Sequence, residues 1–150
     1  MHKFTKLTAV ALSLVALSAC STSSARDLIS FEPDKNYQEM YLRGVFNWWE
    51  ATDQFKFSRI APDLYTITIE LIADGQPYDF KVADASWTPD FNCGFEYSPR
   101  RVELYEPVEL ICEQTGQNIQ FVPSDTGLFT FEFDISDNNE PELTITRVDN

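Results

Sequence analysis

The strongest constraint on the fold is the alternation of apolar and polar residues in two segments, 64–71 and 128–135. A period of two places every second side chain on the same face of a β-strand, so that one face is buried and the other is hydrated. Seven more segments are candidate strands on the same grounds of pattern and composition. They are 40–46, 54–60, 78–83, 101–105, 108–113, 118–122 and 143–148.

Turn-forming residues lie between these candidate strands, at 61–63, 74–77, 88–90, 124–127 and 137–141. Clusters of Pro, Gly, Asn, Asp and Ser are typical of loops. Short strands at this spacing predict an all-β fold, an antiparallel β-sandwich, and no helix is expected after the N-terminal segment. A chain of 150 residues with 12 phenylalanines is long and apolar enough for one domain with a core.

The N-terminal segment has the features of a secretory signal peptide. Lys3 and Lys6 precede a short apolar run at 7–17, too short to span a membrane as a helix. The run ends in Leu-Ser-Ala-Cys20, which resembles a bacterial lipoprotein processing site. That resemblance implies that Cys20 carries lipid and becomes the first residue, and the absence of Asp after it implies the outer membrane. The alternative is a plain secretory signal in which Cys20 is incidental.

The predicted division is therefore a signal peptide at 1–19, a lipid-anchored flexible tether at 20–37 and one domain at 38–150. Removal of the signal takes away two lysines and the single histidine, which leaves 9 basic against 24 acidic residues and a net charge of −15. A charge of this sign disfavours nucleic acid and anionic membrane surfaces as ligands. Without histidine, the processed chain cannot use His-based acid–base, nucleophilic or zinc chemistry, and we expect no metal and no cofactor.

Two further cysteines, Cys93 and Cys112, remain after processing. An even number of cysteines in a secreted chain predicts a disulfide. It would close a loop of about 20 residues and stabilise the domain by about 3 kcal/mol in the chain-entropy model.

The segment 78–94 carries residues suited to a neutral, hydroxyl-rich ligand. Its strand has one apolar and one polar face, with Lys81 on the polar face, and a polar turn with Trp87 and Asn92 follows. A sugar ring has an apolar face that stacks on an indole, and its hydroxyls need partners such as Lys and Asn.

Together with Tyr-Leu-Arg-Gly-Val-Phe-Asn-Trp-Trp at 41–49, this segment resembles the immunoglobulin-like domain that precedes the catalytic barrel in bacterial pullulanases and related α-amylases. That domain is related to starch- and glycogen-binding modules, and the resemblance spans about residues 38–148. It implies an immunoglobulin-like sandwich, with Trp49, Lys81 and Trp87 at the positions of the sugar-contacting residues and Asn118 near a further one.

The resemblance implies non-catalytic binding of α-glucans of the starch, glycogen or pullulan type. The alternative is an envelope scaffold that keeps the fold and docks a protein, such as a glycan-processing enzyme. Exposure of Trp49 and Trp87 on one surface favours sugar binding, whereas burial favours the scaffold. Trp48 and Trp49 are adjacent, so in an extended segment they point to opposite sides and one of them is expected in the core.

Two other chemistries are disfavoured. Glycoside hydrolysis needs two carboxylates about 5–10 Å apart across a cleft, whereas the acidic residues here are scattered along expected solvent faces, so the chain is not expected to be an enzyme. The acidic segment 134–140 has some similarity to a calcium loop but lacks the central Gly and the distal Glu of an EF-hand, so it predicts a hairpin turn.

Overall fold

The computed structural model describes residues 35–137 and 140–149. The expected signal peptide, Cys20 and most of the expected tether lie outside the described residues. The compact unit begins at Lys35, and Tyr37 is fully buried in its core. The folded unit therefore starts slightly before the expected boundary at residue 38. No helix in the described ranges is long and apolar enough to cross a membrane.

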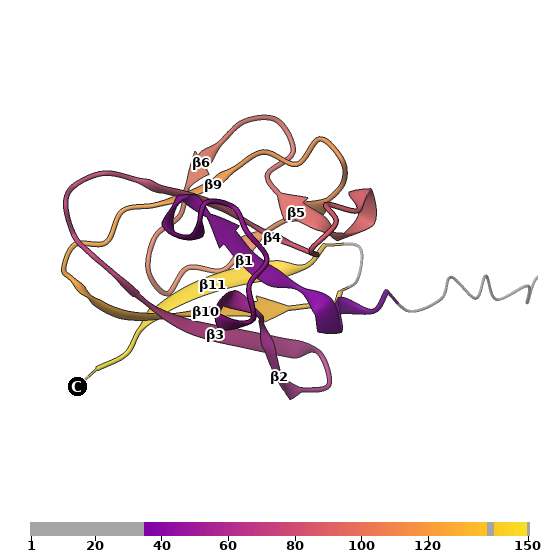
Figure 1. Ribbon diagram of the computed structural model, residues 1–150, viewed down its shortest axis with the longest axis horizontal. Helices are drawn as coiled ribbons and strands as arrows, with labels where there is room; N and C mark the ends of the chain where they lie inside the picture. Colours follow the sequence, from indigo (N-terminus) through magenta and orange to yellow (C-terminus); the bar gives the residue numbers. More distant parts are fainter. Residues whose placement is uncertain (1–34, 138–139, 150) are drawn as a thin grey trace, which may run out of the picture. The chain divides into compact units, whose positions relative to one another are not determined.

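The described residues form a sandwich of two β-sheets (Figure 1). The first sheet has the order β6 (Arg100–Arg101), β9 (Ile119–Phe121), β4 (Tyr78–Ala83), β5 (Asn92–Gly94) and β8 (Ile111–Cys112), with β1 (Tyr41–Gly44) paired to β4. The second sheet has the order β2 (Ser58–Ala61), β3 (Leu64–Leu71), β10 (Gly127–Asp134), β11 (Glu142–Arg147) and β7 (Val108–Glu109). Only β6 and β9 pair in parallel among the described strands. The predicted all-β sandwich is confirmed.

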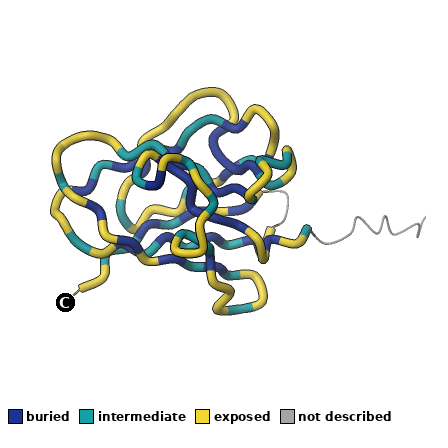
Figure 2. Tube along the Cα trace, viewed as in Figure 1, coloured by how far each residue is buried: buried dark blue, intermediate teal, exposed yellow. Residues whose placement is uncertain are grey.

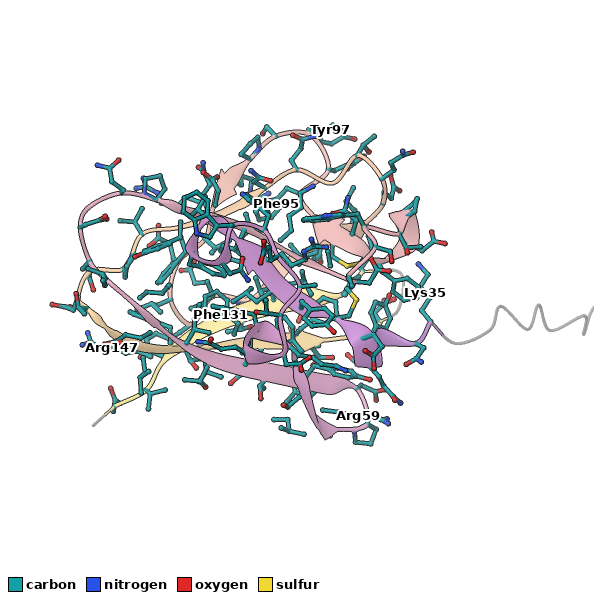
Figure 3. All side chains as sticks on the ribbon, in the orientation of Figure 1. Lys35, Arg59, Phe95, Tyr97, Phe131 and Arg147 are labelled. Atoms are coloured by element: carbon teal, nitrogen blue, oxygen red, sulfur yellow. A yellow bond between two sulfur atoms is a disulfide. The ribbon has the colours of Figure 1, made fainter. Side chains whose placement is uncertain are left out.

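Phenylalanines fill the space between the sheets. Phe129, Phe131 and Phe133 alternate along β10 and are buried, with Phe131 inside the sandwich (Figure 3). The Phe131 ring meets Phe80 of the first sheet edge-on, with centroids 5.3 Å apart. Edge-to-face contacts of this kind are favourable beyond the area they bury. Figure 2 shows the buried positions on the inner strands and the exposed ones in the connecting loops. The alternation in the sequence thus encodes the core.

The shortest strands differ from the predicted ones. The candidate segment 108–113 divides at the buried Leu110 into β7 and β8, which belong to different sheets. The segment 54–60 begins with a 3-10 turn, Asp53–Phe55, and 101–105 holds only the end of β6. The segment interpreted as a polar turn contains β5. Strands of two or three residues are too short to show a period, and their partners define them.

The predicted disulfide between Cys93 and Cys112 is present. The two residues are direct partners in the β5–β8 ladder, so the bond joins neighbouring strands of the first sheet. The acidic segment after β10 leads into β11, its antiparallel partner, and residues 138–139 of it are not described. The amide of Ser136 donates to the Asp134 carboxylate, 2.8 Å away, which is a turn contact. The described residues hold no group of three or more potential His, Cys, Asp or Glu metal ligands.

Candidate functional site

Two loops that follow strands of the first sheet carry all three tryptophans of the chain. The first loop follows β1 and contains Trp48 and Trp49, and the second follows β4 and contains Trp87. Because β1 and β4 are antiparallel, the end of β1 at Gly44 pairs with Phe80, whereas its start at Tyr41 pairs with Ala83, next to the second loop. The first loop must therefore fold back along β1 to reach the second.

Asn47 and Gly44 make this return possible. The buried Asn47 amide accepts a hydrogen bond from the Gly44 N–H and donates one to the Leu42 carbonyl, each 2.9 Å long. The Trp49 N–H donates to the Gly44 carbonyl over 2.9 Å. A Cβ at position 44 would lie only 2.6 Å from the carbonyl oxygen of Asp79, so no larger residue fits. This geometry explains why Gly and Asn occur three residues apart in the 41–49 motif.

Asp84 fixes the second loop. Its carboxylate accepts hydrogen bonds from the Thr88 N–H at 2.8 Å and from the Thr88 hydroxyl at 2.6 Å. The Asp84 N–H donates to the Phe91 carbonyl at 3.1 Å, which closes the loop before β5. Trp87 stands inside this closed loop, so its backbone has a defined conformation.

All three tryptophans have left-handed backbones. Their φ angles are 54° at Trp48, 63° at Trp49 and 57° at Trp87, and Tyr105 is the only other non-glycine residue with a positive φ in the described part of the chain. A side chain with a Cβ costs about 1–2 kcal/mol in this region. The local structure therefore holds three bulky residues in a conformation that usually selects Gly or Asn.

Arg43 connects the two loops. Its guanidinium Nε donates to the Trp49 carbonyl at 2.7 Å, and Nη1 donates to the carbonyls of Asp84 at 2.7 Å and Ala85 at 3.1 Å. The guanidinium carbon also lies 3.8 Å from the centroid of the Trp87 ring, a cation–π contact. Burial lowers the pKa of Arg43 below its ordinary value, and the Asp84 charge opposes this shift. One buried side chain thus holds the backbones of both tryptophan loops.

The rings of Trp49 and Trp87 consequently lie side by side, and we call this pair the tryptophan platform. Their centroids are 6.2 Å apart, the rings are inclined at 43°, and both residues are partly exposed. Trp48 is 87 % exposed. The prediction that Trp48 or Trp49 enters the core is therefore wrong, because it assumed an extended segment and the backbone there is left-handed.

Lys81 lies beside the platform on the outer face of the first sheet, as the cross-strand partner of Arg43. It is half-buried, and its ammonium donates to the Gly116 carbonyl of the turn before β9. Burial lowers the pKa of Lys81. The expected hydrated face is thus partly covered at this position.

Asn118 follows that turn, directly before Ile119, which pairs with Phe80. Since Ile119 faces the core, Asn118 belongs to the outer face, next to Lys81 along the ladder. Asn118 and Lys81 therefore lie near each other. The Asn118 backbone carbonyl accepts a hydrogen bond from the Arg100 N–H at 3.3 Å. Asn92 is buried in β5, with its amide nitrogen 3.3 Å from the Gln114 carbonyl, and is not part of the platform.

Three residues that shape this site were not recognised from the sequence, namely Arg43, Asn47 and Asp84. A single arginine within the apolar candidate strand 40–46 was the available signal for Arg43, because a charged residue is rarely buried without partners.

The class that the described residues define is a β-sandwich of two sheets, one of which carries the tryptophan platform in its loops. Among solved structures, the chain is similar to the ligand-induced structure of AmyP-SBD, a starch-binding domain, with a TM-score of 0.56 and 14 % sequence identity. The match covers 99 % of this chain and 97 % of that one. No protein-family model matches the sequence, and no curated protein does. At this identity the likeness establishes the shared fold.

Proposed function

We propose that this protein is a non-catalytic module that binds α-glucans through the tryptophan platform. The observation that carries the proposal is the side-by-side arrangement of Trp49 and Trp87, two partly exposed indoles brought together from loops 38 positions apart in the sequence. Their contact depends on Arg43, Asn47 and Asp84, whose hydrogen bonds fix the two loops. The starch-binding domain that shares the fold supports the same ligand class.

The chemistry of the platform suits a neutral polysaccharide. Stacking a sugar ring on indole removes apolar area from water at about 25 cal/mol per Å². After ordering costs, a few rings give affinities between about millimolar and micromolar. In this proposal Lys81 and Asn118, on the adjacent outer face, meet the sugar hydroxyls, and the Lys81 ammonium keeps donors beyond its bond to the Gly116 carbonyl. Because the ligand is uncharged, binding should depend weakly on salt despite the acidic composition.

The cellular setting of this function is a further part of the proposal. The signal-like segment and the Leu-Ser-Ala-Cys20 sequence suggest a lipid-anchored protein of the cell envelope, at the outer membrane. A module held there would retain α-glucan chains close to the cell surface, where a separate glycan-processing enzyme acts on them.

Affinity gel electrophoresis with glycogen, amylopectin and a β-glucan tests the function directly. The purified protein should be retarded by the two α-glucans and not by the β-glucan. Trp87→Ala should abolish most of the retardation while the thermal unfolding transition stays cooperative, because the ring contacts ligand rather than core. Tyr105→Ala is the matched control, since Tyr105 is also an aromatic residue with a left-handed backbone at the surface, but its backbone N–H donates to the Ile145 carbonyl of β11 in the other sheet. Absence of retardation in every α-glucan would refute the proposal.

One observation favours the alternative function, a protein-docking scaffold. A groove of about 560 Å³ runs along segment 95–100 and the β7–β8 segment, and none of the tryptophans lines it. Tyr97 at this groove is 85 % exposed (Figure 3). Tyr97→Ala should leave glucan retardation unchanged, and a protein partner lost with Tyr97→Ala but kept with Trp87→Ala would support the scaffold.

A further inference from the structure

Trp48 lowers the stability of the free protein, because its backbone is strained and its indole is exposed to water. It combines φ 54° with ψ 29°, and 87 % of its surface is exposed. The described residues make no hydrogen bond or ring contact with its side chain. A large exposed indole in a left-handed backbone gains nothing from the core, whereas Gly or Asn would adopt the same backbone at little cost.

The backbone on both sides of Trp48 is fixed. The Trp49 N–H donates to the Gly44 carbonyl at 2.9 Å, and the Glu50 N–H donates to the Asn47 carbonyl at 3.0 Å. Asn47 is itself anchored through its amide to Gly44 and Leu42. The Trp48 Cα therefore has a set position about 3.8 Å from that of Trp49, the distance between adjacent residues. An indole on such a base has only two side-chain torsions to order when a ligand arrives.

We infer that Trp48 extends the tryptophan platform and stacks on a further sugar residue of the same chain. This inference rests on the proposed function and adds a specificity to it. The site takes an internal stretch of several linked glucose units, because two rings meet Trp49 and Trp87 and the next one meets Trp48. A site of this form prefers long linear α-glucan chains over maltose-sized ends.

The test is the dependence of affinity on ligand length. Isothermal titration calorimetry with a series of linear α-1,4 oligosaccharides from maltose to maltoheptaose should show that wild-type affinity rises with length. Trp48→Ala should weaken maltoheptaose binding about tenfold, the loss of one aromatic stacking contact, and leave maltose binding within about twofold. Trp48→Phe should restore most of the length dependence, because it returns a flat ring.

Matched controls separate the possible outcomes. Tyr105→Ala removes an exposed aromatic residue with a left-handed backbone away from the platform, and it should leave the affinity for both maltose and maltoheptaose unchanged. If wild type binds the series and Trp48→Ala binds it equally well, the extension is refuted while the proposed function stands. If Trp48→Ala weakens the binding of maltose and of maltoheptaose by the same factor, Trp48 supports the platform instead of extending it, and the inference is also refuted. If wild type binds no member of the series, the proposed function itself fails.

Discussion

Arg43→Met removes a side chain that hydrogen-bonds to both tryptophan loops and keeps much of its apolar volume. The substitution breaks three hydrogen bonds to the carbonyls of Trp49, Asp84 and Ala85. Hydrogen bonds that involve a charged group contribute about 1.5–3 kcal/mol each. The Ala85 carbonyl belongs to an exposed residue, so water can replace that bond, whereas Trp49 and Asp84 are partly buried.

The loss is therefore dominated by two bonds. Methionine also avoids the free-energy cost of dehydrating a guanidinium, and this offsets part of the stability that the lost hydrogen bonds provided. We expect a net destabilisation of about 2–4 kcal/mol, below the 5–15 kcal/mol stability typical of a domain. The sandwich should remain folded, and the two loops should lose their fixed relation. Because an affinity change of tenfold corresponds to about 1.4 kcal/mol, α-glucan binding should weaken at least about tenfold.

Urea unfolding, near-ultraviolet circular dichroism and calorimetry measure the three consequences. The dichroism of the adjacent Trp49 and Trp87 rings should fall in the native state, which a uniform loss of stability would not produce. Arg43→Lys should recover little, because one ammonium cannot reproduce the forked geometry of guanidinium. Arg59→Met is the matched control, since Arg59 also donates to backbone carbonyls, those of Ala61 and Pro62, but lies on β2 of the other sheet (Figure 3). Wild-type dichroism and affinity in Arg43→Met would refute the reasoning.

Three further outcomes follow from the described contacts and the N-terminal sequence. Replacing Cys93 and Cys112 with alanine should cost at most about 3 kcal/mol in urea unfolding and preserve the fold, because the sheets have their own core; peptide mapping without reductant should recover the linked pair from wild type. Burial lowers the pKa of Lys81 in the folded state, so its charge destabilises the fold at every pH below that pKa. This penalty is relieved as the pH rises from the folded-state pKa to the pKa of the unfolded chain. The stability of wild type relative to Lys81→Met should therefore increase on alkaline titration. Labelled palmitate should enter the wild-type protein and be lost in Cys20→Ser, and an unlabelled soluble wild-type product would contradict the lipid anchor.

The long strands could be predicted because their burial has a period. The bounds of β3 and β4 agree with the expected segments, and β10 differs by one residue at each end. The strand β5 could not be found in this way, because three residues show no alternation and its existence depends on pairing with β4 and β8. The disulfide between Cys93 and Cys112 was predicted from the cysteine count and the secretory signal, and it lies within that missed ladder.

The platform was predictable only in part. Resemblance to sugar-binding domains indicated Trp49 and Trp87, and the structure brings their rings together. The role of Arg43 could not be derived, because its acceptors are backbone carbonyls up to 42 positions away and carbonyls carry no sequence signal. The left-handed backbones were missed for a related reason. Intrinsic preference argues against tryptophan there, and the hydrogen bonds that Asn47 and Asp84 make within their own loops override it.

The left-handed backbone of Trp48 allows the stability that the protein loses to backbone strain at this site to be measured. Trp48→Ala keeps a Cβ and hence the backbone strain, whereas Trp48→Gly relieves about 1–2 kcal/mol of it. Glycine also gives the unfolded chain more freedom, which costs about 0.4–1 kcal/mol. Trp48→Gly should therefore be up to about 1.6 kcal/mol more stable than Trp48→Ala in urea unfolding, while both lose the same affinity for long α-glucans. A stability well below that of wild type in both variants would mean that the exposed indole supports the fold, and the case for Trp48 as a ligand contact would fall with it.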